Sequence, residues 1–284
     1  MSRIFEALQK SPGGKASGFS DFASALRETP QFEAEAPVAS PVDLEQFPAL
    51  AVTVPRDSRI FCLTDKDSLG SEKFRFLGVR LRQLQQSQGL KKILVTSTIP
   101  EEGKSTISAN LAATLARKPQ HRVLLLDGDL RRPSLSRLLG LRNLKGLSEW
   151  LRAEPDARET IYRLDGPGFW FLPAGAPADN PLDLMQSARF VALMERLAGW
   201  FDWIVIDTPP VLPLADTSVW AKSTDGILLV AREGTTRKRQ LQRGLAALDT
   251  KKLIGVVLNN SRNTDHTDYY QRYGSGVKKV PDPI

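Results

Sequence analysis

Cysteine and histidine are scarce in this 284-residue chain, which holds one cysteine, Cys62, and two histidines, His121 and His266. A single cysteine allows no disulfide within the chain and no cysteine-only metal or iron–sulfur site. The two histidines are far apart in the sequence and lack the short spacing of paired metal ligands. The composition therefore excludes a disulfide-stapled scaffold and argues against zinc catalysis.

Long hydrophobic runs are also missing. No stretch approaches about 18 consecutive apolar residues, so the sequence predicts no transmembrane helix. The first ten residues have no apolar core and no cleavage site, so we expect no secretory signal and a cytoplasmic location. Basic residues outnumber acidic ones by 39 to 32, which gives a net charge of +7 and suggests an anionic partner such as a nucleotide, a nucleic acid or a membrane surface.

Composition divides the chain into four segments. The spacing of Ile4, Phe5 and Leu8 predicts a short N-terminal helix with these residues on one face, with a frayed terminus as the alternative, and the region after it is punctuated by proline and glycine. We expect the N-terminal extension and the C-terminal tail to be disordered. The predicted segments are a short helix at 1–10, a flexible linker at 11–58, a folded domain at 59–260 and a polar tail at 261–284.

Strand-like and helical patterns alternate within the predicted domain. Short apolar runs predict buried strands, and segments with apolar residues three or four positions apart predict helices. Continuous apolar strands separated by helices indicate an α/β fold with a parallel twisted sheet covered on both faces, which binds ligands at the carboxyl ends of its strands. The predicted strands are 93–95, 123–126, 203–206, 227–230 and 253–258, with a further edge strand at 59–65, and the predicted helices are 72–86, 107–116, 182–198, 214–222 and 237–248.

The segment 95–106 predicts a phosphate-binding loop, because it follows a strand and leads into a helix. Gly103 lets the backbone approach phosphate oxygens, and the helix start offers unpaired amides and a positive dipole end. Lys104 suits the β- and γ-phosphates, and Ser105 suits magnesium. The residues expected to bind the nucleotide are Thr98, Glu102, Gly103, Lys104, Ser105, Thr106 and Asn259.

This loop matches the pattern G-x-x-x-x-G-K-[ST] incompletely. Thr98 stands at the first glycine, and Glu101 and Glu102 lie inside the loop. A carboxylate facing a triphosphate would repel it, so we expect both glutamates to point outward.

Carboxylates follow two of the predicted strands directly. Asp127 and Asp129 come after one strand, and Asp207 comes after another. Each alone could simply cap a helix or turn. Because unpaired buried carboxylates are costly, these two acidic strand ends together with the phosphate loop indicate a magnesium ion shared with the nucleotide. The residues expected to hold it are Ser105, Asp129 and Asp207, some of them through water.

The type of nucleoside is less well defined by the sequence. No Asn-Lys-x-Asp segment that reads guanine occurs, which favours ATP over GTP. Asn259 and Asn260 follow the last predicted strand and either meet a base edge or only turn the chain. The expected cofactors are ATP and Mg²⁺, with no other metal.

The motifs at 98–105, 127–133 and 207–210 resemble, in this order, the Walker A, Walker A′ and Walker B motifs of bacterial tyrosine kinases. These are the autokinases of capsule and exopolysaccharide systems, within the MinD/ParA-like P-loop class. The resemblance covers residues 71–276. Ile99 stands where ParA and MinD relatives carry a second signature lysine, which favours the kinases.

The resemblance implies an ATP-dependent protein-tyrosine autokinase that regulates exopolysaccharide or capsule biosynthesis and export. Its catalytic residues would be Lys104, Asp127, Asp129 and Asp207, with Asp127 accepting the tyrosine proton. The implied partners are a separate membrane-anchored activator, other copies of this chain and a cognate phosphatase. The implied location is the inner face of the membrane, reached through a partner, and nucleic acid is not expected.

Two departures from the family pattern bear on this reading. Glu101 replaces the glycine of the common loop Pro-Gly-Glu-Gly-Lys. In the oligomerisation motif Glu-x-x-Arg-x-x-Arg, Glu72 and Arg75 match, but Gly78 replaces the last arginine. The sequence therefore supports nucleotide binding more strongly than ring assembly.

Three of the four tyrosines, Tyr269, Tyr270 and Tyr273, lie inside the polar tail and fall in a single stretch of five residues. Without the phosphate loop, an edge strand or a docking tail would explain this cluster equally well. With it, the cluster is expected to be phosphorylated in trans by a neighbouring subunit, and each phosphate adds about −1.5 to −2 charge that disfavours assembly. The alternatives are a ParA/MinD-like ATPase switch, for which Arg237–Arg239 would form a basic patch, and a degenerate nucleotide-binding adaptor.

Overall fold

The computed structural model describes residues 43–55, 58–153, 156, 159–212 and 215–261. The predicted helix at 1–10, most of the predicted linker and the three tail tyrosines lie outside the described residues. Among the described helices, none is long and apolar enough to cross a membrane.

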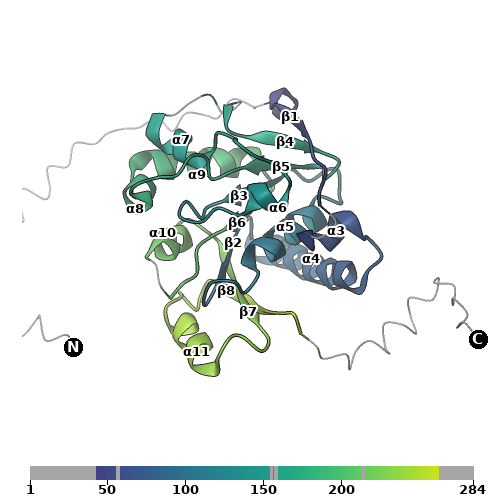
Figure 1. The fold of residues 1–284 in the computed structure, drawn as a ribbon, viewed down its shortest axis with the longest axis vertical. Helices are drawn as coiled ribbons and strands as arrows, with labels where there is room; N and C mark the ends of the chain where they lie inside the picture. The colour runs from purple at the N-terminus through teal and green to yellow at the C-terminus, as the bar shows by residue number, and fades with distance from the viewer. Residues whose placement is uncertain (1–42, 56–57, 154–155, 157–158, 213–214, 262–284) are drawn as a thin grey trace, which may run out of the picture. The chain divides into compact units, whose positions relative to one another are not determined.

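An eight-stranded sheet forms the centre of the domain (Figure 1). Its order is β1-β4-β5-β3-β6-β2-β7-β8, and the six strands from β5 to β8 run parallel to one another. β4 runs antiparallel to β5, and β1 joins the edge parallel to β4. The strands are β1 (Ala49–Ala51), β2 (Lys92–Ser97), β3 (Val123–Asp127), β4 (Tyr162–Asp165), β5 (Phe169–Leu172), β6 (Trp203–Asp207), β7 (Gly226–Arg232) and β8 (Leu253–Asn259).

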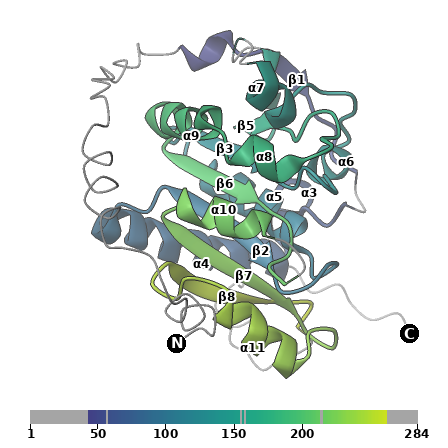
Figure 2. The same ribbon diagram turned by 90° about the vertical axis from the view of Figure 1, so that its left-hand side faces the viewer.

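Helices cover both faces of this sheet (Figure 2). Two apolar cores result, one on each face, and the central strands β2, β3 and β6 are buried along nearly their whole length. The fold is therefore of the predicted α/β class, with a sheet covered by helices on both faces, and the predicted parallel order holds except at β4. One face carries α3 (Phe61–Thr64), α4 (Leu69–Gln88), α5 (Lys104–Leu115) and α6 (Leu135–Leu138), and the other carries α7 (Leu147–Ala153), α8 (Pro181–Met185), α9 (Ala188–Trp200), α10 (Asp216–Lys222) and α11 (Lys238–Ala246).

Three local predictions are wrong. The segment 59–65 contains helix α3 (Phe61–Thr64) rather than an edge strand, because Cys62 is buried and its N–H donates to Asn110 of α5 at 3.0 Å. The helix predicted at 182–198 is broken into α8 and α9, because the Ser187 hydroxyl accepts the N–H of Phe190 and begins a new helix.

The third correction concerns the linker. Residues 44–51 are part of the folded domain, since Leu44 and Phe47 are buried and β1 pairs with β4. The described part also includes the short 3₁₀ helix Leu44–Gln46. The proline-rich composition of this region concealed a strand of only three residues.

Candidate active site

The loop between β2 and α5 has the geometry of a phosphate-binding loop. α5 begins at Lys104, earlier than predicted, so the amides of its first turn lie at the end of the loop. Gly103 has a φ of +90°, and a Cβ there would lie 2.2 Å from the Asn259 Nδ2 atom. Glycine is required at this position because both the conformation and the space exclude a side chain.

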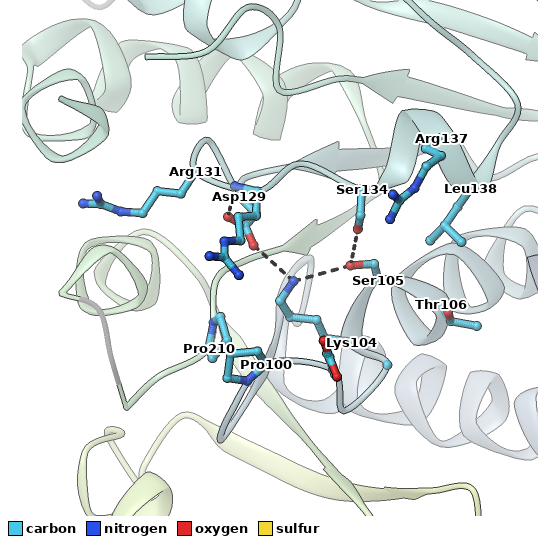
Figure 3. Close-up of a pocket in the computed structure, with 13 residues that line it drawn as sticks. Pro100, Lys104, Ser105, Thr106, Asp129, Arg131, Ser134, Arg137, Leu138 and Pro210 are labelled. Atoms are coloured by element: carbon cyan, nitrogen blue, oxygen red, sulfur yellow. Dashed lines mark hydrogen bonds and ion pairs between the residues drawn. The ribbon is translucent and has the colours of Figure 1, made fainter. Parts of the chain in front are cut away.

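A cavity of about 700 Å³, which we call the phosphate cavity, opens beside this loop (Figure 3). It lies at the carboxyl ends of β2 and β3, where a parallel sheet places its ligand. Its walls carry Pro100, Glu101, Gly103, Lys104, Ser105, Thr106, Asp129, Arg131, Arg132, Ser134, Arg137, Leu138 and Pro210.

Lys104 and the aspartates of two neighbouring strands meet at this cavity. The Lys104 Nζ atom lies 3.2 Å from the Asp129 Oδ2 atom and 4.0 Å from the Asp207 Oδ2 atom. Burial alone would lower the pKa of Lys104, but the Asp207 and Asp129 carboxylates outweigh it and raise that pKa above its ordinary value. The amine is therefore held as a cation where phosphate charge would lie.

Asp127 lies behind the cavity rather than on its wall. It is completely buried and pairs in register with Asp207 on the adjacent strand. Its two carboxylate oxygens accept the N–H groups of Asp129 (3.3 Å) and Leu135 (3.1 Å). Burial, followed by the charge of Asp207, raises the pKa of Asp127 to about 8. This arrangement suits a residue that positions Asp129, and it does not suit the expected direct proton acceptor.

The oxygen donors around Lys104 fit a magnesium ion. Asp207 is fully buried, and its Oδ2 atom has no hydrogen-bond partner among the described residues. The Ser105 hydroxyl faces the cavity and accepts a 2.8 Å hydrogen bond from Ser134. The described residues contain no cluster of three His, Cys, Asp or Glu side chains placed to hold a metal by themselves. Mg²⁺ usually binds with one or two carboxylates, phosphate oxygens and water, so this sparse donor set is sufficient.

Glu102 does not point outward, contrary to expectation. Its side chain is buried beneath the loop, where the Oε2 atom accepts the N–H groups of Thr98 (2.6 Å) and Ile99 (2.9 Å). The Oε1 atom accepts a hydrogen bond from the Thr236 hydroxyl. The carboxylate therefore braces the loop from behind instead of facing the phosphates.

Thr98, at the position of the first glycine, is also turned away from the cavity. It is fully buried, does not line the cavity, and packs against Gly244 of α11, where an added Cβ would lie 3.0 Å from the Thr98 methyl group. The backbone N–H of Thr98 already donates a hydrogen bond to the Glu102 carboxylate, so Thr98 is not placed to bind phosphate directly.

Sequence reasoning missed the residues that hold this loop from the β7 and β8 side. The Arg232 guanidinium donates to the carbonyl of Glu101 (3.2 Å), and the Asn259 side-chain amide donates to the carbonyl of Glu102 (2.9 Å). Asn259 was expected at the nucleotide from its strand-end position, but its support of the loop was not predicted, and Arg232 and Thr236 carried no signal in the sequence.

A second cavity, of about 730 Å³, lies on the other side of the loop. It shares Gly103 and Thr106 with the phosphate cavity, and Asn259 also lines it. A ligand bound along the start of α5 can therefore reach both cavities.

Glu101 supplies a test of the loop. It is exposed on the cavity wall with a φ of +66°, a conformation that costs a non-glycine residue about 1–2 kcal/mol. Glu101→Gly is expected to tighten Mg²⁺–ATP binding about two- to fivefold, because it removes a nearby negative charge. The strain is present with and without nucleotide, so its relief affects the stability of the fold and not the affinity. Isothermal titration of the wild type, Glu101→Gly and the charge-only control Glu101→Gln measures this. Unchanged affinity in both variants would contradict it.

Comparison with known proteins defines the class first. Residues 93–281 match the family model of the CobQ/CobB/MinD/ParA nucleotide binding domain. The chain therefore belongs to this class of nucleotide-binding P-loop domains, in agreement with its sheet and phosphate loop.

Two relatives and one solved structure narrow the assignment. The chain is 31% identical over 212 residues to the tyrosine-protein kinase YwqD of Bacillus subtilis, an alignment that covers 74% of this chain and 89% of YwqD. It is 33% identical over 194 residues to the tyrosine-protein kinase CpsD of Streptococcus pneumoniae, covering 67% of this chain and 85% of CpsD. The kinase domain of the Escherichia coli tyrosine kinase ETK superposes with a TM-score of 0.67 and 26% identity, covering 73% of this chain and 80% of that domain. Within the MinD/ParA-like class, the chain is a bacterial tyrosine-protein kinase.

Proposed function

We propose that this kinase transfers the γ-phosphate of ATP to tyrosines in the tail of another copy of the chain. The acceptors would be Tyr269, Tyr270 and Tyr273, which lie outside the described residues. The single observation that carries the proposal is the meeting of the Lys104 ammonium with Asp129 and Asp207 beside Ser105, at the start of a helix. This arrangement places a cation, metal-binding oxygens and free amides at one point, as phosphoryl transfer needs.

Each residue of the site would have a separate role in binding the nucleotide or in transferring phosphate. Lys104 would neutralise charge on the β- and γ-phosphates, and the amides from Gly103 to Thr106 would bind phosphate oxygens. Ser105, Asp129 and Asp207 would hold Mg²⁺, which supplies further positive charge when bound. The nucleoside would extend into the second cavity, along Thr106 towards Asn259. Asp127 would act by positioning Asp129, and most of the rate would come from holding the reactants in line.

The kinase would act in capsule or exopolysaccharide synthesis and export. A membrane-anchored activator would bring it to the inner face of the membrane, and a cognate phosphatase would reverse the modification. Phosphorylated tails, with their added negative charge, would disfavour contacts between copies of the chain, and dephosphorylated tails would favour them. The resemblance to the capsule and exopolysaccharide kinases supports this context.

Removal of the tail hydroxyls tests the proposal. The triple variant Tyr269→Phe, Tyr270→Phe, Tyr273→Phe is expected to lose at least about nine-tenths of its phosphotyrosine signal after incubation with Mg²⁺–ATP, and to stop changing its oligomeric state on incubation. Immunoblotting and size-exclusion chromatography measure the two effects, with and without a candidate activator. An unchanged signal and an unchanged shift in oligomeric state would exclude the tail as substrate. DNA retention without phosphotyrosine in the wild type would favour the ATPase-switch alternative.

A further inference from the structure

Three arginines line the phosphate cavity, but only one of them is committed to a partner within the described residues. The Arg131 guanidinium binds both carboxylate oxygens of Asp216, at 2.6 and 3.1 Å, and extends away from Lys104 in Figure 3. Among the described residues, the guanidinium groups of Arg132 and Arg137 have no hydrogen-bond or ion-pair partner, and both residues are exposed. Two unpaired cationic groups therefore stand on the wall of the site.

The nucleotide does not account for these two arginines. Lys104, the loop amides and a magnesium ion already meet the charge of the triphosphate. Arg137 belongs to α6 and lies beside Ser134 in Figure 3. The Ser134 hydroxyl donates a hydrogen bond to Ser105. Neither Ser134 nor Arg137 lines the second cavity. Arg132 and Arg137 thus lie at the phosphate end of the site, where an acceptor enters, and not at the nucleoside end.

The tail sequence provides the complementary charge. Asp265 and Asp268 precede Tyr269 by four residues and one residue, whereas Arg272 directly precedes Tyr273. A peptide that binds in extended form advances about 3.3 Å per residue, so an acid next to the acceptor tyrosine would stay close to the cavity wall when the ring enters the cavity. A carboxylate there can pair with a guanidinium, and an arginine there is repelled.

We propose that Arg132 and Arg137 form an acceptor subsite that selects tyrosines preceded by acidic residues, so that Tyr269 is phosphorylated ahead of Tyr273. This inference rests on the proposed function, because it specifies the substrate class of the same site. It adds a specificity role for two residues to which the proposed function assigns no contact with ATP.

Trans-phosphorylation between full-length chains tests it. Wild-type enzyme is incubated with Mg²⁺–ATP and full-length Lys104→Met chain as the substrate, and the phosphate on each tyrosine is quantified by mass spectrometry over time. We expect Tyr269 to react about tenfold faster than Tyr273. Arg137→Glu enzyme should lose this preference while its KM for Mg²⁺–ATP stays unchanged. The matched control is Arg196→Glu, which makes the same charge change at an exposed position on α9 and should behave as wild type.

A charge exchange separates recognition from damage to the fold. Asp268→Arg in the substrate chain should slow phosphorylation of Tyr269 by wild-type enzyme about tenfold, and Arg137→Glu enzyme should restore it. The substrate variant also keeps the test open if Arg137→Glu does not fold. Equal Tyr269-to-Tyr273 ratios for wild type, Arg137→Glu and Arg196→Glu, or a raised KM for Mg²⁺–ATP with an unchanged ratio, would overturn the subsite alone. No transfer by wild-type enzyme to any tail tyrosine would overturn the proposed function and the subsite with it.

Discussion

Lys104→Met is expected to reduce phosphotyrosine formation at least about 100-fold, the scale of losing one group that stabilises transition-state charge. The described residues place this single ammonium within 4.0 Å of both Asp129 and Asp207, so methionine leaves their charge, and that of a bound phosphate, uncompensated. Initial rates of phosphotyrosine formation at saturating Mg²⁺–ATP, measured with the candidate activator, report the loss. Nucleotide affinity should fall as well, because the proposed role of the lysine includes contact with the phosphates before transfer.

Two further variants make this result interpretable. Lys118→Met removes a lysine from an exposed position outside the cavity and should leave the rate unchanged. Removing one partner of a buried ion pair can cost about 3–5 kcal/mol, so the melting temperature of Lys104→Met must be measured beside its activity. If that variant does not fold, Ser105→Ala tests the same site by removing the hydroxyl oxygen that we propose binds magnesium. Full activity in a folded Lys104→Met chain would show that the chemistry takes place elsewhere.

The second large effect concerns Asp127 and pH. Its pKa is raised to about 8 by burial and by Asp207, whereas in the unfolded chain it titrates near 3.8. Between about pH 4 and pH 8 the folded protein keeps a proton that the unfolded chain has released, so the free energy of unfolding falls as pH rises through this window. Without nucleotide, Asp127→Asn should remove much of this dependence and raise the melting temperature at pH 8 by about 4 °C or more.

The same substitution should lower activity. Asparagine can accept only one of the two backbone N–H groups that the carboxylate accepts, so the segment carrying Asp129 would be held less well. A loss of about 10–100-fold is typical when such a supporting contact near a metal is removed. Thermal melts from pH 5 to pH 8.5 and kinase assays of the same samples check both effects. Asp165→Asn, at an exposed position on β4, is the control. If the melting temperatures of wild type and Asp127→Asn change with pH in the same way across this range, the raised pKa of Asp127 is excluded.

The parallel sheet could be predicted because its central strands are buried on both faces. A buried strand must be apolar throughout, so β2, β3, β6 and β7 appear in the sequence as short continuous runs. The edge of the sheet could not be predicted in the same way. β1 has three residues and an exposed–intermediate–exposed pattern, and it forms only because β4 offers a free edge beside it.

The side-chain directions of the two glutamates in the phosphate loop could not be predicted from the local sequence. Two adjacent carboxylates have the same chemistry in the sequence, and the only local argument was repulsion from phosphate. In the structure Glu101 faces the cavity, while Glu102 turns beneath the loop because Thr236, 134 positions away, and two loop amides occupy its oxygens. The direction of the Glu102 side chain was thus decided by a partner that lies just beyond a distant strand end.

Gly78 illustrates the same limit. The family pattern expects an arginine there, but the residue is buried against α5, and an added Cβ would lie 2.9 Å from the Thr114 methyl group. Arg75 of the same motif pairs with Glu72 on its own helix. A glycine at this position is therefore explained by helix packing within the domain.

Unaided, the amino-acid order determined the α/β class, the phosphate loop and the acids at the strand ends, because periodicity and strand–loop–helix context are local properties of a chain. Only the folded arrangement decided which of those acids face the cavity and which brace its walls. That choice depends on contacts such as Lys104 with Asp207 and Glu102 with Thr236, whose partners are separated by more than 100 residues and meet only once the sheet has formed.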